Sequence, residues 1–400
     1  MASTIAAVTT SGGGVVTTAD ASGNLNLLAG TTTVVALTTA GAAVTGTLSA
    51  TGLISGSLDQ VTGFKNRIIN GGMTISQRNG TSATTVNGND IYTLDRFKGW
   101  ASGGGVFTVT QSTTAPTGFN NSSLITVTTV DSSIAAGDNY RFAQTIEGYN
   151  IADLGFGTAN ASTVTLSFWV RSSITGTFGG SLYSVSGTRS YVFNYTISAA
   201  NTWEQKTVTI AGDTSGTWGT TNSYGITVYF DLGSGSNYEN ATGSWVAAEK
   251  FRTSGNATLI STLSSTWYVT GVQLEKGSTA TSFDYRPYGT ELALCQRYYQ
   301  RLKPSASGSF LAAGLQRSTT SAGLVVSTPV SLRTTPTSTQ SGLIITDDAT
   351  YGQSISSIDV ITNSGSNIGL TVTNSAGGTA YRPCLMRGDV GNYIDFSAEL

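Results

Sequence analysis

The stretch TLSFWVR, residues 165–171, decides the fold class of this chain. Its apolar residues Leu166, Phe168 and Val170 are spaced by two, so they share one face of an extended strand. The serine, tryptophan and arginine between them point to the other face. This period of two predicts a β-strand with one face in a core.

The same period recurs at 207–210, 226–230 and 267–275, and glycines separate these segments. In 267–275, simple alternation places Tyr268, Val272 and Leu274 on one side and Trp267, Gln273 and Glu275 on the other. Many short strands with Gly-rich turns predict a jelly-roll β-sandwich over residues 64–288, the zone that holds all six tryptophans. The expected fold class is therefore all-β.

The amino-acid composition is compatible with β-strands and excludes some classes of function. Only 10% of the 400 residues are charged, 39% are hydrophobic, 49 are glycine, and the net charge is -2. Disordered chains combine low hydrophobicity with high charge, which is not the case here. A net charge near zero gives no attraction to nucleic acid, and no apolar run reaches the ~20 residues of a membrane span. We therefore expect neither nucleic-acid binding nor membrane insertion.

Residues 1–63 contain no Lys, Arg or aromatic residue, and their only acids are Asp20 and Asp59. Short apolar runs such as 32–37 are each long enough for one strand. A segment this small cannot bury a core of its own. It is either a disordered leader or a set of strands that share a core with identical chains around a threefold axis. We favour the second alternative, an extended, intertwined anchor or stalk.

A short connecting helix is expected at 289–303, because Leu292, Cys295, Tyr299 and Leu302 form an apolar stripe. Residues 304–400 return to strand patterns and predict a small C-terminal β domain, the distal tip. The two cysteines, Cys295 and Cys384, are too few for a disulfide scaffold, and both are expected to be free, buried thiols.

Several kinds of chemistry are excluded or unsupported. The chain has no histidine, so nucleophile–histidine pairs and imidazole zinc sites are excluded. No phosphate-binding loop is present, and no acidic loop supports calcium, although carbonyls and Asp would suit it. We expect no cofactor. Two carboxylates suffice for glycoside hydrolysis, and the candidates for such a pair are Asp213, Asp231, Glu239 and Glu249.

Aromatic rings beside polar side chains favour sugar binding over cutting. One candidate set lies on the predicted outer strand faces and comprises Trp169, Arg171, Trp267, Gln273 and Glu275. A second set lies in the Gly/Ser/Thr-rich stretch 212–245 and comprises Trp218, Tyr224, Tyr238 and Trp245. Both sets have an alternative, in which the rings pack against a neighbouring protomer or domain.

Several sequence blocks occur in an order that resembles phage tail-fibre proteins. These blocks are 66–73 with 75–78, 92–97, 166–171, 271–277, 283–288 and 291–299. The resemblance implies a jelly-roll similar to carbohydrate-binding modules, carried on a trimeric virion fibre. Within the blocks, Asp95 and Arg96 are expected to pair with each other. Phe283, Tyr285 and Tyr288 are expected to plug the base of the sandwich.

These observations lead to a functional hypothesis. The chain would be a non-enzymatic, homotrimeric tail-fibre subunit, made in the host cytoplasm and located on the virion tail. Residues 1–63 would bind other tail proteins, and the β domains would contact host surface polysaccharide. The alternatives are a head fibre, a capsid-decorating or baseplate protein without receptor binding, and a glycan depolymerase.

Overall fold

The computed structural model describes residues 64–347, 352–375 and 377–400 in full, and the backbone of four strands nearer the N-terminus. These strands form an antiparallel sheet in chain order: β1 (Val16–Ala19), β2 (Leu25–Ala29), β3 (Thr32–Thr38) and β4 (Gly41–Val44). The chain divides into two compact units between Gly63 and Phe64. The side chains of 1–63 lie outside the described residues, so the shared core expected there stays a prediction.

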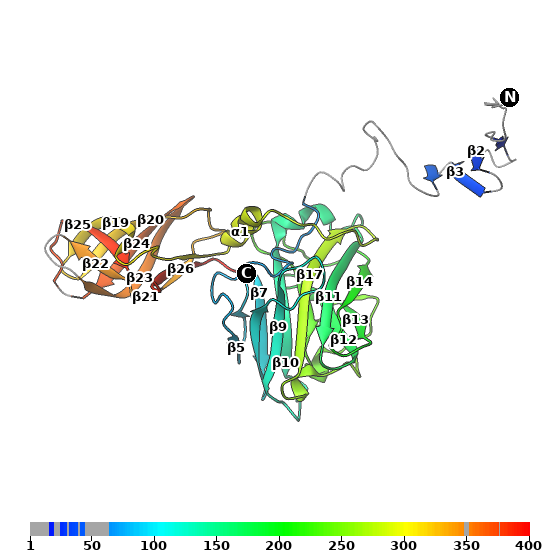
Figure 1. Cartoon of the computed structure of the whole chain (residues 1–400), viewed down its shortest axis with the longest axis horizontal. Coiled ribbons are helices and arrows are strands. Elements are labelled where there is room, and N and C mark those ends of the chain that lie inside the picture. The colour runs from blue at the N-terminus through cyan, green and yellow to red at the C-terminus, as the bar shows by residue number, and fades with distance from the viewer. Residues whose placement is uncertain are drawn as a thin grey trace. The chain divides into compact units, whose positions relative to one another are not determined.

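The second unit begins with a two-sheet β-sandwich (Figure 1). Its seven-stranded sheet has the order β16 (Trp245–Val246), β13 (Arg189–Ile197), β12 (Gly176–Ser184), β15 (Tyr224–Asp231), β10 (Asn139–Glu147), β7 (Phe97–Ser102) and β6 (Ile91–Tyr92). The six-stranded sheet has the order β14 (Glu204–Ile210), β11 (Val164–Ser172), β17 (Thr266–Lys276), β9 (Ser122–Thr129), β8 (Val106–Ser112) and β5 (Thr84–Val86). The chain passes repeatedly between the sheets, and the all-β jelly-roll-like sandwich is confirmed.

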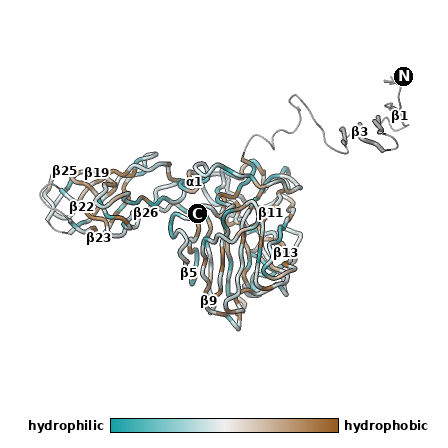
Figure 2. Tube along the Cα trace, in the orientation of Figure 1, coloured by the Kyte–Doolittle hydropathy of each residue, from teal (hydrophilic) through white to brown (hydrophobic). Residues whose placement is uncertain are grey.

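Large aromatic side chains fill the space between the two sheets, and the hydrophobic residues follow the strands in Figure 2. The fully buried ones are Phe107, Tyr140, Phe142, Phe168, Phe178, Phe230 and Trp267. Leu166, Phe168 and Val170 all point into this core, as their alternation predicts. Burial of such rings supplies most of the favourable free energy of a sandwich.

Simple alternation fails in β17. Between Ser167–Gln273 and Trp169–Thr270, β11 advances two residues while β17 advances three. The extra residue is a bulge at Gly271, whose φ of 61° lies in the left-handed region that favours glycine. Trp267 therefore faces the core together with Leu274, and its predicted place on the outer face is wrong.

The segment that follows Phe64 extends the six-stranded sheet beside the second half of β17. Arg67 N donates to the carbonyl of Leu274, and Val272 N donates to the carbonyl of Gly71. The Asn66 amide donates to the carbonyl of Val272 and accepts from Leu274 N. The blocks 66–73 and 271–277 therefore form one structural joint, although about 200 residues separate them in the chain.

The connecting helix is shorter than predicted. Helix α1 covers Tyr288–Gln296, and the chain then turns into β18 (Tyr299–Leu302), which pairs with β26 (Tyr393–Ser397). Tyr299 and Leu302 therefore belong to a strand, because hydrogen bonds to β26 replace those of a longer helix. The region with a β pattern starts at 299, five residues before the expected boundary at 304.

The remaining strands form the small C-terminal β domain. A closed barrel has the order β19 (Ser309–Ser318), β20 (Ser321–Ser327), β24 (Asn367–Asn374), β23 (Gln353–Ser364), β22 (Ile344–Asp347) and β25 (Pro383–Gly388). Beside it, β18 and β21 (Thr337–Ser341) flank β26. Both cysteines are free and buried, as predicted: Cys384 in the barrel core and Cys295 in α1.

The expected pair of Asp95 and Arg96 does not form. Asp95 accepts hydrogen bonds from the backbone and side chain of Gln77, whereas the Arg96 guanidinium pairs with Glu399 and lies over the Tyr298 ring. Arg96 thus joins the sandwich to the last residues of the C-terminal domain. Its partner lies 303 positions away, which no local pattern can identify.

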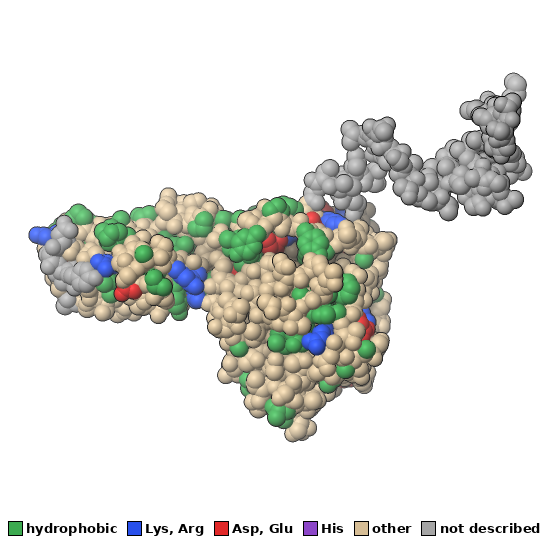
Figure 3. All heavy atoms as spheres, in the orientation of Figure 1, with side chains coloured by type: hydrophobic (Ala, Val, Ile, Leu, Met, Phe, Trp, Pro, Cys, Tyr) green, Lys and Arg blue, Asp and Glu red, His purple; other side chains and the backbone are tan. Residues whose placement is uncertain are grey.

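Charged side chains are few on the surface shown in Figure 3, where neutral polar side chains and backbone dominate. Within the residues described in full, no helix is both long and apolar enough to span a bilayer.

Candidate functional site

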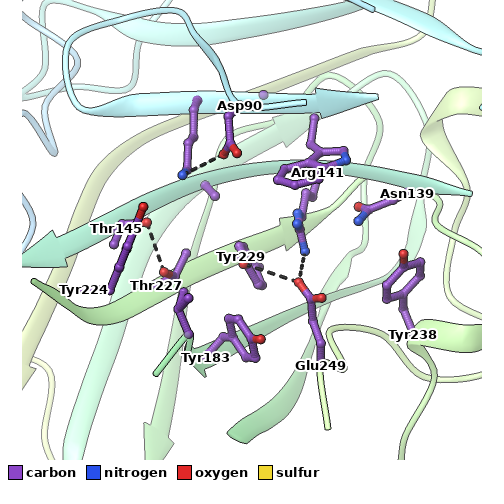
Figure 4. Close-up of a pocket in the computed structure, with 15 residues that line it drawn as sticks. Asp90, Asn139, Arg141, Thr145, Tyr183, Tyr224, Thr227, Tyr229, Tyr238 and Glu249 are labelled. Atoms are coloured by element: carbon purple, nitrogen blue, oxygen red, sulfur yellow. Dashed lines mark hydrogen bonds and ion pairs between the residues drawn. The ribbon is translucent and has the colours of Figure 1, made fainter. Parts of the chain in front are cut away.

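A groove of about 300 Å³ lies on the outer face of the seven-stranded sheet. Its floor comes from β7, β10, β15 and β12, and its walls come from the turn before β6 and the segment 232–252 (Figure 4). The lining combines five aromatic residues with two cations and two carboxylates. The aromatic residues are Trp100, Tyr183, Tyr224, Tyr229 and Tyr238.

The strand register places the floor in rows. In the middle row, Lys98 lies opposite Ala143, which lies opposite Tyr229. Rows on the same face follow at intervals of two residues. One of them pairs Trp100 with Arg141. The other row runs from Thr145 to Thr227 and then to Tyr183, and the two threonine hydroxyls lie 3.0 Å apart.

The guanidinium of Arg141 occupies a cage of aromatic rings. It lies 4.2 Å from the centroid of Trp100 and 4.3 Å from that of Tyr229, and it pairs with Glu249 across the groove. Burial disfavours this charge, but Tyr229 and Glu249 raise the pKa of the guanidinium above its ordinary value. Arg141 therefore keeps its charge and fixes the two rings in place.

The second cation of the groove is also paired. Lys98 Nζ lies 2.7 Å from a carboxylate oxygen of Asp90. Burial lowers the pKa of Lys98 below its ordinary value, and the hydrogen bond that Lys98 donates to Asp90 opposes this shift. With Lys98 and Arg141 both matched by acids, the groove carries no net charge.

This arrangement suits a neutral, hydroxyl-rich ligand. Aromatic faces stack on the C–H surfaces of a sugar ring, while ion-paired side chains and threonine hydroxyls can bond to its hydroxyl groups. Tyr183 and Tyr229 stack at 5.5 Å, so the floor is rigid before a ligand arrives. A preformed surface costs less ordering free energy on binding.

The first predicted set of site residues does not come together. Trp169 and Arg171 are half-buried on the outer side of β11, where Arg171 Nε donates to the carbonyl of Asn201. Trp267 is buried in the core, where its indole donates to the Tyr195 hydroxyl. The expectation that these residues share one exposed face is wrong.

Gln273 and Glu275 do point outward but are covered. The segment after β17 folds back over them: Thr281 N donates to the Glu275 carboxylate, and Asp284 N donates to the side-chain amide oxygen of Gln273. Their exposed fractions are 0% and 1%, respectively. An exposed role for these two residues is therefore wrong as well.

The second predicted set divides in two. Tyr224 and Tyr238 line the groove, and Tyr224 is 41% exposed. Trp218 and Trp245 instead pack edge-to-face on each other at 5.3 Å and on Phe156, so they close one end of the sandwich.

Sequence reasoning missed most of the groove. Its unpredicted members include Asp90, Lys98, Trp100, Arg141, Tyr183 and Tyr229, and Glu249 appeared only as a possible carboxylate. Alternation in 97–102 did carry a signal, because Lys98 and Trp100 share a face opposite Phe97. What the sequence lacked was the strand order that sets β7, β10 and β15 side by side.

Each of the four carboxylates considered for hydrolysis lies beside an arginine, and two of them share one. Asp213 binds Arg189, Glu249 binds Arg141, and Asp231 and Glu239 both lie 3.7 Å from Arg252. In the part of the chain that the structure describes, no group of three or more Asp, Glu, Cys or His side chains could hold a metal ion.

No protein-family model matches the chain, and no curated protein matches it. Among solved structures, it is similar to the enzymatically active domain of tailspike protein 4 from bacteriophage CBA120, at 14% identity and TM-score 0.27 over 53% of this chain and 21% of that one. A putative sugar-binding protein from Bacteroides thetaiotaomicron matches at 13% identity and TM-score 0.31, over 53% of this chain and 100% of that one. A family 11 carbohydrate-binding module from Clostridium thermocellum, in complex with a mixed-linked tetrasaccharide, matches at 10% identity and TM-score 0.27, over 50% of this chain and 99% of that one. At these values, the likeness carries no conclusion about function.

Proposed function

We propose that this protein binds a neutral glycan in the groove of the seven-stranded sheet and does not cleave it. The observation that carries the proposal is the groove itself, a rigid aromatic floor on which both cations are already paired with acids. An anionic polysaccharide would need a free cation, whereas a neutral sugar needs ring faces and hydrogen-bonding groups.

We further propose that the glycan lies on a host surface and that the chain is a trimeric subunit of a phage tail fibre. The ordered sequence blocks support this assignment, as do the absence of histidine and the absence of aromatic residues from 1–63. In this proposal, residues 1–63 attach the subunit to other tail proteins. Light scattering of the full chain tests the trimer, with an expected mass of three times 41.2 kDa. A monomer would contradict it.

The alternatives give different results on intact particles. Antibody labelling places a tail fibre on the tail, whereas a head fibre or decorating protein would be labelled on the shell. A depolymerase would shorten host polysaccharide during incubation with the pure protein. The ion pairs of Asp90 and Glu249 support binding without cleavage, because hydrolysis needs one carboxyl group to deliver a proton.

A glycan array with the full chain tests groove binding, and Trp100→Ala is the informative variant. Trp100 lines the groove and is not part of the buried core, so its loss should weaken binding about tenfold without unfolding the protein. Tyr381→Ala is a matched control, because Tyr381 is 81% exposed in the C-terminal domain and does not line the groove. Equal glycan binding by wild type and Trp100→Ala would refute the groove as the site.

A further inference from the structure

A second group of aromatic residues lies at the bulge of β17, in the six-stranded sheet. We call it the aromatic platform, and it consists of Phe119, Phe283, Tyr285 and Tyr288. The sequence led us to expect three of these residues to plug the base of the sandwich. That expectation is wrong for two of them, because Tyr285 is 61% exposed and Tyr288 is 65% exposed.

The platform is built on the bulge. Phe119 lies directly on Gly271, where a Cβ would be 2.6 Å from its Cζ atom. Phe283 contacts Phe119 edge-to-face at 5.0 Å and Tyr285 at 4.9 Å. The Tyr285 hydroxyl donates to the carbonyl of Gly118 at 2.8 Å, which fixes the tilt of this exposed ring.

A hollow of about 240 Å³ opens beside these rings. Polar groups line the rest of it, namely Thr74, Asn120, Arg286 and Glu291. The two charged ones pair with each other at 3.4 Å, and Arg286 also donates to the carbonyl of Ile68. The hollow thus offers ring faces and neutral polar groups but no unpaired charge.

The dimensions decide between possible occupants. A helix about 10 Å wide fills about 400 Å³ in each turn, which exceeds the volume of the hollow. A single pyranose ring fits it, with one face on an exposed tyrosine and its hydroxyls beside Asn120 and Thr74. In Figure 3, hydrophobic side chains gather at the surface beside α1, the helix that begins with Tyr288.

We propose that the aromatic platform is a second binding site for neutral glycans, separate from the groove. The two sites belong to different sheets, the groove to the seven-stranded sheet and the platform to β17 of the six-stranded sheet. A protein with two such sites can engage two chains, or two points of one chain, and gains avidity from the second contact.

The test uses the full chain labelled with 3-fluorotyrosine and observed by fluorine NMR. The resonances of Tyr285, Tyr288 and Tyr224 are assigned with single Tyr→Phe variants. The probes are soluble neutral oligosaccharides of glucose, galactose, mannose and xylose. At least one probe should shift the Tyr285 and Tyr288 resonances, and this shift should persist in Trp100→Ala, which damages only the groove.

A second variant measures the contribution of the platform. Tyr288→Ala in the Trp100→Ala background should weaken the remaining binding about tenfold, since it removes one exposed ring. Tyr149→Ala is the matched control, because Tyr149 is 60% exposed and lies outside both sites. Tyr288 is mostly exposed, so its loss should leave the melting temperature unchanged.

Two results would overturn the proposal. In the first, no probe shifts Tyr285 or Tyr288. In the second, these resonances move with protein concentration in the absence of sugar, which would identify the platform as a contact between copies of the chain. The Tyr224 resonance reports the groove independently, so a failure of the platform and a failure of the groove are distinguishable.

Discussion

The outer faces of the two sandwich sheets differ in what covers them. On the seven-stranded sheet, the outward residues of β7, β10 and β15 line an open groove. On the six-stranded sheet, Gln273 and Glu275 of β17 point outward too but are sealed beneath residues 281–284. An outward direction in a strand is therefore not the same as exposure, because a later segment of chain can return and cover that face.

The covered face also explains what several of the sequence blocks do in the structure. Asp284 accepts hydrogen bonds from the backbone of Lys65 and Asn66, and Arg286 donates to the carbonyl of Ile68. Glu291 accepts from Asn70 N. The blocks 66–73, 271–277 and 283–288 thus bind one another and hold the joint together. None of the residues that line the candidate groove belongs to these blocks.

The largest expected effect tests which face of β17 meets the core. Trp267→Ala should cost about 3–5 kcal/mol of unfolding free energy, because it leaves a cavity between Phe142 and Phe230. Trp169→Ala is the control, since Trp169 is half-buried on the outer side of the neighbouring strand. Denaturant unfolding measures both variants. Equal losses would mean that the bulge does not reverse the alternation.

A smaller effect is expected from the bulge residue itself. Gly271→Ala forces a side chain into a left-handed conformation, at about 1–2 kcal/mol, and presses on the ring of Phe119. Gly255→Ala is the control for the cost of the left-handed backbone alone, because Gly255 has φ of 79° and open space around it. The difference between the two melting curves therefore measures the ring contact. Identical melting curves would show that the Phe119 ring moves aside without a measurable loss of stability.

The smallest effect compares the carboxylates of the two faces. Glu275→Gln should cost about 1–2 kcal/mol. One carboxylate oxygen accepts from both Thr281 N and the Gln273 amide, so the new NH₂ group would replace the other oxygen, which accepts from the Thr281 hydroxyl. Glu249→Gln should cost less, because the Glu249 side chain is 33% exposed and water can replace it beside Arg141. Chemical denaturation ranks the two variants. If Glu249→Gln lowered the unfolding free energy more than Glu275→Gln, the carboxylate in the groove would contribute more to stability than the carboxylate on the covered face.

Part of the candidate site could be predicted and part could not. Tyr224 and Tyr238 were singled out as aromatic residues on polar loops, and both line the groove. Trp218 and Trp245 lie in the same polar stretch of sequence, but they pack on each other. Whether an aromatic residue in a loop is exposed or buried depends on which residues the fold places beside it, and the sequence does not give these neighbours. Arg141 was missed although Tyr140, Phe142 and Ile146 alternate around it, because alternation gives the face of a residue but not its neighbours on the adjacent strands.

The sequence by itself determined the all-β class, the inward residues of β11, the two free cysteines and the exclusion of histidine chemistry. Each of these is either a count or a pattern with a period of two, so it can be read within a few residues. Only the tertiary structure decided that Trp267 turns inward, that Glu275 is covered, and that Arg96 pairs with Glu399. A bulge, a returning segment and a distant ion pair depend on contacts between residues far apart in the chain, and local periodicity contains no information about them.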